Sequence, residues 1–395
     1  MVTRSGWLLL VVSAVMLAAG RSFGLAEFFV LGATGICLVI WAVMDVWRRA
    51  AHLDVERIVH PRRVHLAGYS RVELRVTNQS SRRSPLLTLL DPVAGTVGAR
   101  VALAPLASGA TTSASYRLPT DRRGIVQVGP LEAQRTDAFG LARRRVVVAE
   151  TATLTVLPAI EAIPTFFGGG AADDPLSGAG HPVVGAAGDE DFATLRPYTV
   201  GDDLRRVHWA SSARAGDLLV RQDDPPWKGH ITVLLDARAD RLNADTFEVA
   251  VCAAASLIHA IANKGDRCRL VITDGTDTGL VDARAAQDTL LEHLAIVARH
   301  APNQLQASNT GARGRTGGLV VMTSAPSPAD LAQIKAAHRS FAAVHLVVFD
   351  PSCAGGTPQH PPAGVEAGVD VSFIDAATSF SLAWGQRSSR TGSKP

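Results

Sequence analysis

The chain is poor in the motifs that nucleotide and metal chemistry require. Its glycine-rich stretch, residues 167–190, holds neither a GxxxxGKS/T loop nor a GxGxxG turn between a strand and a helix, which argues against an intrinsic nucleotidase. The cysteines form no CxxC pair and have no histidine neighbour at the spacing of zinc ligands. Cys37, Cys252, Cys268 and Cys353 are therefore expected to be reduced packing residues in a reducing compartment.

An excess of charge of one sign is also missing. Charged residues make up only 19% of the chain, and 39 Lys and Arg face 36 Asp and Glu, for a net charge of +3. A near-balance of this kind is not expected of a protein that binds nucleic acid through its overall charge. The length of 395 residues suits two or three domains.

Two apolar runs open the chain, at residues 6–20 and 24–44. The second is long enough to cross a bilayer, which takes about 20 residues, whereas the first also has the length and flanks of a signal peptide. The preferred interpretation is a pair of transmembrane helices within residues 1–50 that turns at Arg21–Phe23. Basic residues flank both outer ends, so the positive-inside rule predicts a multi-pass cell-membrane protein whose soluble domains are cytoplasmic.

Residues 51–160 show the alternation of half-buried strands, as in Arg71–Asn78 and Ala152–Pro158, with turn-forming residues between the strands. Short strands at this spacing predict an antiparallel β-sandwich domain. This part has no cluster of nucleophile, base or metal ligands. Residues 161–190 are rich in Gly, Ala and Pro and are predicted to form a flexible linker.

Strands and helices alternate in the last domain, residues 230–395. The pattern predicts strands at 230–236, 268–274, 317–324 and 342–350 and helices at 244–265, 283–300 and 328–339. Near-continuous apolar strands between amphipathic helices indicate an α/β fold, a doubly wound and mostly parallel sheet covered on both faces. Ligands of such sheets bind beyond the carboxyl ends of the strands, so the positions of interest are Asp236, Asp274, Ser324 and Asp350.

A polar segment, residues 191–229, precedes this domain. Its candidate binding or structural residues are Arg196, Tyr198, Gly201, Asp202, Asp203, Arg205, His208, Trp209, Arg214 and Arg221. Arginines and acidic residues balance one another here, which favours an internal ion-pair network over a phosphate-binding strip. Asp202 is expected to cap a short helix, and a partner-docking surface built on the network is the second interpretation.

Catalysis by this segment is the third interpretation, with Asp202 and His208 as an acid/base pair and Ser211 or Ser212 as nucleophile. It is disfavoured because a short helix would point Asp202 and His208 to different sides. No catalytic residue is therefore assigned.

The spacing R-x-Y-x-x-G-D-D-x-R-x-x-x-W-x-x-x-A-R, which runs from Arg196 to Arg214, resembles the domain-of-unknown-function 58 family of membrane-anchored bacterial proteins. The stretches Arg122–Pro130 and Thr136–Arg145 and the two apolar runs extend this likeness over nearly the whole chain. The resemblance implies that the last domain is similar to von Willebrand factor A domains. It also implies a MoxR-type AAA+ ATPase as partner.

A-domains of that kind often bind Mg²⁺ through Asp-x-Ser-x-Ser after the first strand, because this ion takes hydroxyl, carboxylate and water oxygens in an octahedron. Here the loop reads DARAD: Asp236 is kept, but Arg238 and Asp240 replace the serines, and Ser324 stands where a later aspartate is expected. A guanidinium at this position repels a cation and can pair with Asp236 or Asp240. The resulting hypothesis is a metal-free domain without cofactor, and the alternative is a weak site built on Asp236 and Asp240.

The expected function is that of a non-enzymatic, membrane-anchored scaffold for protein–protein interaction with a MoxR-type AAA+ ATPase system, in complex assembly or envelope maturation. One alternative is a metal-dependent hydrolase at the strand ends of the A-like domain, which the altered DARAD loop disfavours. The other is a metal-dependent adhesion module, which would require the opposite membrane topology.

Overall fold

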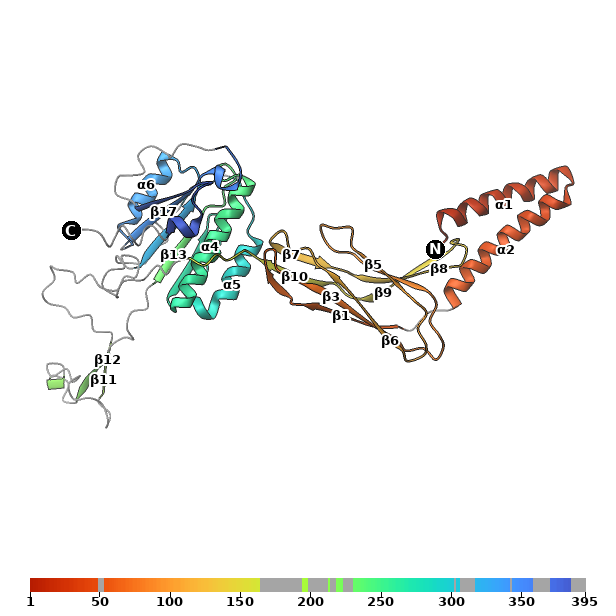
Figure 1. Ribbon diagram of the computed structural model, residues 1–395, viewed down its shortest axis with the longest axis horizontal. Coiled ribbons are helices and arrows are strands. Elements are labelled where there is room, and N and C mark those ends of the chain that lie inside the picture. The colour runs from red at the N-terminus through yellow and green to blue at the C-terminus, as the bar shows by residue number, and fades with distance from the viewer. Residues whose placement is uncertain are drawn as a thin grey trace. The chain divides into compact units, whose positions relative to one another are not determined.

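A computed structural model describes residues 1–48, 53–163, 194–197, 212–213, 218–222, 230–301, 303–305, 317–341, 343–357 and 370–384. The chain divides into two compact units, Met1–Leu157 and Pro158–Pro395 (Figure 1). Helices and mostly antiparallel strands make up the first unit, and a mostly parallel sheet with helices makes up the second.

The first unit opens with a helical hairpin of α1 (Arg4–Phe23) and α2 (Ala26–Arg48) (Figure 1). Both helices are long and apolar enough to cross a membrane, as the sequence predicts, and they are consistent with membrane anchoring. The turn lies at Gly24, beyond the predicted Arg21–Phe23. The reason is that α1 continues until Gly24 adopts the left-handed conformation, with φ 68°, that ends a helix.

Small residues let α1 and α2 approach closely. A Cβ added to Gly35 would lie 2.1 Å from Oγ of Ser13, and one added to Gly32 would lie 2.6 Å from the carbonyl oxygen of Ser13. In a membrane, where burial of apolar surface does not drive helix association, this close backbone packing supplies much of the attraction between helices.

Ten strands follow the hairpin. They are β1 (Leu53–His60), β2 (Arg63–His65), β3 (Arg71–Asn78), β4 (Leu87–Asp91), β5 (Ala99–Leu103), β6 (Thr111–Arg117), β7 (Gly124–Val128), β8 (Leu131–Thr136), β9 (Arg143–Ala149) and β10 (Ala152–Leu157). Three sheets form, in the orders β1-β3-β6, β5-β4-β8-β9 and β2-β10-β7, and every pairing except the parallel β2–β10 pair is antiparallel.

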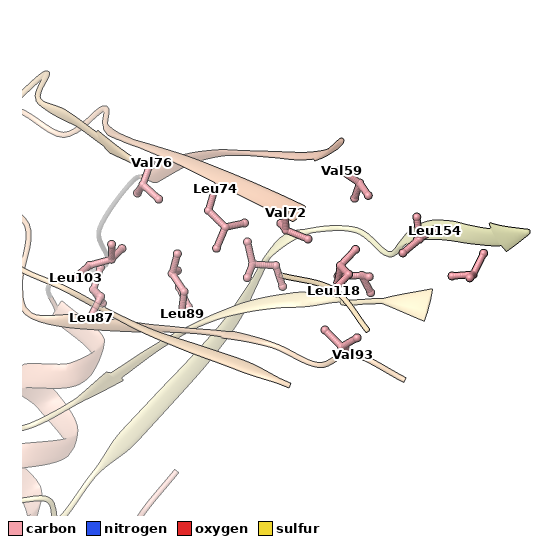
Figure 2. Packing of buried hydrophobic residues seen from close by; sticks show 14 residues of the cluster. Val59, Val72, Leu74, Val76, Leu87, Leu89, Val93, Leu103, Leu118 and Leu154 are labelled. Atoms are coloured by element: carbon pink, nitrogen blue, oxygen red, sulfur yellow. The ribbon is translucent and has the colours of Figure 1, made fainter. Parts of the chain in front are cut away.

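One apolar core joins these sheets. Every second residue of β3 points inward, so Val72, Leu74 and Val76 are buried, and they face Leu87 and Leu89 of β4 (Figure 2). The period-two alternation in the sequence therefore produces strands whose apolar sides face a shared interior.

The second unit contains β13 (His230–Leu235), α4 (Ala244–Lys264), β14 (Arg267–Ile272), β15 (Val281–Asp282), α5 (Ala283–Ile296), β16 (Gly318–Thr323), α6 (Pro328–Ala337), β17 (Ala343–Phe349), the short 3-10 helix η3 (Pro351–Ala354) and β18 (Asp370–Ile374). The strand order is β15-β14-β13-β16-β17-β18, and only β15 runs antiparallel to its neighbour. The mostly parallel sheet that the sequence predicts is therefore present, and two further short strands, β15 and β18, extend it.

Helices cover both faces of this sheet. On one face α6 contributes Ile334 and Ala337 to a core with Leu234 of β13 and Val321 of β16, whereas α4 and α5 pack side by side (Figure 1). Helix α4 is also long and apolar enough to cross a membrane, but most of it is buried within the unit. Its apolar character is therefore explained by the core.

The helix predicted at 283–300 ends earlier, at Ile296. After it the chain becomes extended, and the backbone of His300 exchanges hydrogen bonds with Ala237 and Ala239 in the loop that follows β13. Pairing with that loop therefore replaces the last helical turn.

Candidate functional site at the carboxyl ends of the parallel strands

Asp236 follows β13 at the point where the strand order of the sheet reverses. The chain continues from β13 to β14 on one side, and the later strand β16 pairs on the other side. In open α/β sheets this point forms the crevice in which ligands bind. The backbone N–H of Asp236 donates to the carbonyl oxygen of Met322 at 2.9 Å, and the Asp236 side chain is fully buried.

The Asp236 carboxylate accepts four hydrogen bonds. Its Oδ1 accepts from the backbone N–H of Arg238 at 3.1 Å and from the Arg238 Nε at 2.9 Å. Its Oδ2 accepts from Nη2 of Arg238 at 2.8 Å and from the Thr323 hydroxyl at 2.7 Å. An ionised carboxylate offers about four lone-pair sites. The acceptor capacity of Asp236 is therefore used by groups of this chain.

Every nitrogen of the Arg238 guanidinium also donates hydrogen bonds. The guanidinium reaches a second carboxylate, that of Asp330, through Nη1 at 3.0 Å and Nη2 at 3.1 Å, and Nη1 also donates to the carbonyl oxygen of Asn303 at 3.2 Å. Together with the two bonds to Asp236, these contacts use all five N–H groups of the side chain. Only 3% of the Arg238 side chain is exposed.

Asp330 is held in place by the start of α6. The side chain of Ser327 caps this helix by accepting from the backbone N–H of Asp330, and the Asp330 carboxylate accepts in return from the backbone N–H of Ser327 at 2.9 Å and from its hydroxyl at 2.8 Å. This reciprocal capping box orients the carboxylate toward Arg238. The sequence Ser-Pro-Ala-Asp at the start of α6 builds the motif locally.

Burial and hydrogen bonding act in opposite directions on the ionisation of this cluster. Burial lowers the pKa of Arg238, but its hydrogen bonds to Asp236 and Asp330 raise that pKa above the ordinary value. Burial raises the pKa of Asp330, but hydrogen bonds from Arg238 and Ser327 bring it below the ordinary value. Arg238 and Asp330 therefore remain charged near neutral pH.

A second layer of contacts fixes the loop after β13. The Thr273 hydroxyl accepts from the backbone N–H of Ala237 at 2.8 Å and lies 2.9 Å from Nε2 of His300. Nδ1 of His300 lies 2.6 Å from the carbonyl oxygen of Ala301, which can only accept. Nδ1 of His300 is therefore the donor in this contact.

The residues at this position do not fit a Mg²⁺ ion. Such an ion needs carboxylate or hydroxyl oxygens with free lone pairs, whereas those of Asp236 are taken by Arg238 and Thr323. A guanidinium next to the carboxylate also opposes a cation electrostatically. Within the described part of the chain, no group of three or more His, Cys, Asp or Glu side chains is arranged to hold a metal ion.

The remaining strand-end residues serve local structure. Asp240 lies at the surface, with its carboxylate 3.2 Å from Nε of Arg241, and therefore does not join Asp236 as the alternative metal site requires. Asp274 accepts from the backbone N–H of Thr276 in a turn, Ser324 donates to the carbonyl oxygen of Phe349, and Asp350 caps η3.

Most of the polar segment lies outside the described residues, including Tyr198, Gly201, Asp202, Asp203, Arg205, His208, Trp209 and Arg214, so the expected short helix and ion-pair network remain predictions. Two strands of the segment are described, β11 (Thr194–Pro197) and β12 (Leu219–Gln222), and they pair antiparallel. This register places Arg196 opposite Val220 and Arg221 opposite Leu195.

Sequence reasoning missed Asp330 and Thr323, which complete the cluster. Two signals in the sequence point to them. Ser327 and Asp330 have the spacing of a capping box, and Thr323 is the last residue of β16, the strand that pairs with β13 and precedes Asp330. The carboxyl ends of neighbouring parallel strands meet at one edge of a sheet. Neither signal identifies the neighbouring strand without the strand order.

Comparison with known proteins gives a family match for part of the chain. Residues 194–327 match the family described as protein of unknown function DUF58. The uncharacterized protein YeaD of Bacillus subtilis (strain 168) is 24% identical over 151 residues, which are 38% of this chain and 36% of YeaD. The matched region thus spans little more than a third of that relative.

Solved structures show only distant likeness. A CARDB domain from Pyrococcus furiosus is 16% identical, with a TM-score of 0.22 over 29% of this chain and 97% of that domain. The alkylpurine DNA glycosylase AlkC of Pseudomonas fluorescens is 13% identical, with a TM-score of 0.21 over 39% of this chain and 44% of AlkC. At these TM-scores neither likeness bears on function.

Proposed function

We propose that this protein is a non-enzymatic, membrane-anchored scaffold whose α/β unit contacts other proteins without a bridging metal ion. The observation that carries the proposal is the complete engagement of Asp236: the carboxylate at the ligand-binding position of the sheet is saturated by Arg238 and Thr323. A substrate or cation arriving there would have to displace a bidentate, buried ion pair. Breaking a buried pair of this kind costs about 3–5 kcal/mol.

We also propose that the α/β unit is a von Willebrand factor A-like domain. The strand order β15-β14-β13-β16-β17-β18 is that of a doubly wound sheet whose crevice lies between β13 and β16. The family match over residues 194–327 and the aspartate that closes β13 support the same assignment. Arg238 then occupies the place of the cation that related domains hold.

The anchor and the partner complete the proposal. Helices α1 and α2 would span the membrane, and the basic residues at their outer ends would keep both soluble units in the cytoplasm. The partner is a MoxR-type AAA+ ATPase, on the strength of the resemblance of the polar segment. In this proposal the scaffold brings the ATPase to the membrane. Its role is in the assembly of complexes or in the maturation of the envelope.

The first experiment tests the metal-free site on the full chain in lipid nanodiscs. Mn²⁺, a spectroscopic substitute for Mg²⁺, is titrated while free Mn²⁺ is followed by electron paramagnetic resonance. We expect no binding that depends on Asp236 in the natural protein, so the Asp236→Ala variant should give the same titration curve. A site lost in Asp236→Ala, or a Mn²⁺-dependent hydrolytic activity lost in that variant, would contradict the proposal.

The second experiment tests the partner separately. The tagged full chain is isolated from detergent-solubilised membranes of its own host, and co-purifying proteins are identified by mass spectrometry. A MoxR-type ATPase should be recovered with the natural protein and with Asp277→Asn, a surface variant that serves as the matched control. Recovery of the intact scaffold without that ATPase would contradict the partner while leaving the conclusion about the metal site standing.

A further inference from the structure

The turn between β8 and β9, residues 137–142, packs directly against the base of the helical hairpin. The backbone N–H of Thr3 donates to the carbonyl oxygen of Leu141 at 2.9 Å, and the Thr3 hydroxyl donates to that of Gly140 at 2.6 Å. A Cβ added to Gly6 would lie 2.3 Å from the carbonyl oxygen of Leu141. The sandwich is therefore joined to the first turn of α1 through this β-turn.

An exposed aromatic ring stands at the tip of this turn. Phe139 is 61% exposed, and its ring lies edge-on to that of Trp41 in α2, with centroids 6.2 Å apart. Trp7, near the start of α1, and Trp47, near the end of α2, are also largely exposed. A group of exposed aromatic rings at the end of apolar helices is typical of the interfacial belt of membrane proteins.

The turn holds Phe139 rigidly in this outward position. The buried carboxylate of Asp137 accepts from the backbone N–H of Phe139 at 2.9 Å and from that of Ala142 at 2.5 Å. Gly140 follows with a φ of 70°, in the left-handed region that glycine adopts without strain. The backbone is therefore fixed by residues that leave the aromatic side chain outside the core.

Basic side chains lie at the same end of the sandwich, and acidic side chains near them are paired with arginines. The guanidinium of Arg144 lies 5.0 Å from the ring centre of Trp47, and Arg143 and Arg145 are exposed on the same strand. Asp45 of α2 is paired with Arg135 at 2.6 Å, and Glu132 is paired with Arg145 at 3.5 Å. Lys and Arg side chains near an anionic membrane surface are attracted to it.

The depth of Phe139 follows from its contact with α2. Trp41 lies seven residues before Arg48, which ends α2, so it is about 10 Å along the helix axis from that end. The headgroup region on each side of a bilayer is about 5–8 Å thick. A helix whose last turn reaches the water therefore places Trp41, and Phe139 beside it, at the boundary between headgroups and hydrocarbon.

We propose that the β8–β9 turn is a membrane-contacting element in its own right, which inserts Phe139 among the lipids and sets the arginines of β9 against anionic phospholipid headgroups. The inference rests on the proposal that α1 and α2 span the membrane. It adds that the sandwich lies on the bilayer surface in a fixed orientation, held by the turn and by the helices together.

Site-directed spin labelling of the full chain in nanodiscs of phosphatidylcholine and phosphatidylglycerol tests this inference. The label is attached at Phe139→Cys, with the natural cysteines replaced by alanine. The collision rate of the label with oxygen, which partitions into lipid, is compared with its collision rate with a nickel chelate, which stays in water. A site covered by protein loses access to both reagents, whereas a site covered by lipid keeps access to oxygen.

The chain offers two matched controls. Cys37 is exposed in the middle of α2 and reports lipid, whereas Val97→Cys reports water. The antiparallel register of β4 with β8 puts the β4–β5 turn that carries Val97 at the end of the sheet opposite to Phe139.

The expected result is a several-fold loss of nickel access at position 139 relative to position 97, with oxygen access retained. Equal nickel access at positions 139 and 97, with position 37 still in lipid, would overturn the inference and leave the anchor intact. Loss of access to both reagents at position 139 would also overturn it, because protein would then cover the ring. Nickel access at position 37 equal to that at position 97 would overturn the anchor itself, and with it this inference.

Discussion

Each of the two units buries an arginine–aspartate cluster, and the two clusters differ in where they lie. In the sandwich, Nη1 of Arg57 on β1 donates to Asp91 on β4 at 2.9 Å, and the Tyr116 hydroxyl donates to the other oxygen of Asp91 at 2.6 Å. In the α/β unit, Arg238 lies between Asp236 and Asp330. Each arginine is 3% exposed in its side chain.

The sandwich cluster connects strands of two different sheets. Arg57 belongs to the β1-β3-β6 sheet and Asp91 to the β5-β4-β8-β9 sheet, and the second terminal nitrogen of Arg57 donates to the carbonyl oxygen of Glu150. Room for the guanidinium comes from Gly129, where an added Cβ would lie 2.4 Å from Nη1 of Arg57. One cation meets one carboxylate, so this cluster is balanced and structural.

The α/β cluster places two carboxylates around the buried Arg238, with a second, partly exposed guanidinium, that of Arg241, 4.0 Å from Asp330, and it lies where such sheets bind ligands. The same two residue types therefore connect two sheets in one unit, and in the other they lie at the carboxyl ends of the parallel strands, where we propose that they fill the ligand position. The comparison shows that the chemistry of a buried ion pair does not reveal its role. The role follows from the place of the pair in the sheet topology.

The largest expected effect comes from Arg238→Ala, which leaves two buried carboxylates facing one another. Removing one partner of a buried ion pair destabilises by about 3–5 kcal/mol, and the carboxylate repulsion places this variant at the upper end. Hydrogen exchange of β13 and β16 in the full chain should accelerate accordingly, while β3 of the other unit should not change. The comparison variant Arg241→Ala removes a partly exposed guanidinium that donates to the carbonyl oxygen of Ala325 and lies 4.0 Å from the Asp330 carboxylate, and it should cost only about 1 kcal/mol.

The pH dependence of Arg238→Ala provides the contradicting outcome. In the natural protein the folded-state pKa of Asp330 lies below its unfolded value, so its stabilisation is present above that unfolded value and is lost as pH falls through the folded pKa. In the variant the hydrogen bonds from Arg238 are gone and burial raises the folded pKa of Asp330, so protection of β13 should increase on mild acidification. A variant that loses protection on acidification as the natural protein does would contradict the ion-pair explanation.

A smaller effect is expected in the sandwich from Asp91→Asn. The amide oxygen still accepts one hydrogen bond, but the buried guanidinium of Arg57 loses its counter-charge, so we expect a loss of about 2–3 kcal/mol. Tyr116→Phe, which keeps the charge pair and removes only the hydroxyl donor, should cost about 1 kcal/mol. Exchange of the β3 and β4 amides measures both. Equal effects of the two variants would show that the charge of Asp91 does not matter.

The smallest effect is expected from Asp277→Asn. Arg269 and Asp277 form a close but partly exposed pair at 2.5 Å, and hydrogen bonding to Arg269 holds the pKa of Asp277 below its ordinary value. Exposed pairs contribute about 0–1 kcal/mol because water and salt screen them. Exchange of β14 should change little at neutral pH, and the small contribution should vanish as pH falls through the folded pKa of Asp277. A loss as large as that of Arg238→Ala would remove the distinction between buried and exposed pairs.

Much of the fold could be predicted from local patterns. The apolar runs became α1 and α2, the alternation at Arg71–Asn78 became β3, and the alternating strands and helices after residue 230 became a mostly parallel sheet. The altered DARAD loop predicted that Arg238 pairs with Asp236 or Asp240, because a guanidinium at the metal position can bind a carboxylate instead. The structure selects Asp236 from these two alternatives, whereas Asp240 contacts Arg241 at the surface.

By itself the sequence determined the main helices and strands, though not the short strands β15 and β18, and the carboxylate that closes β13, because side-chain periodicity and short-range spacing act within one element. Only the tertiary structure decided that Asp330, 92 residues after Arg238, becomes its second partner, and that Asp91 becomes the partner of Arg57. Those contacts depend on which strands become neighbours. That choice is made by burial of the apolar faces of whole elements, and no local pattern encodes it.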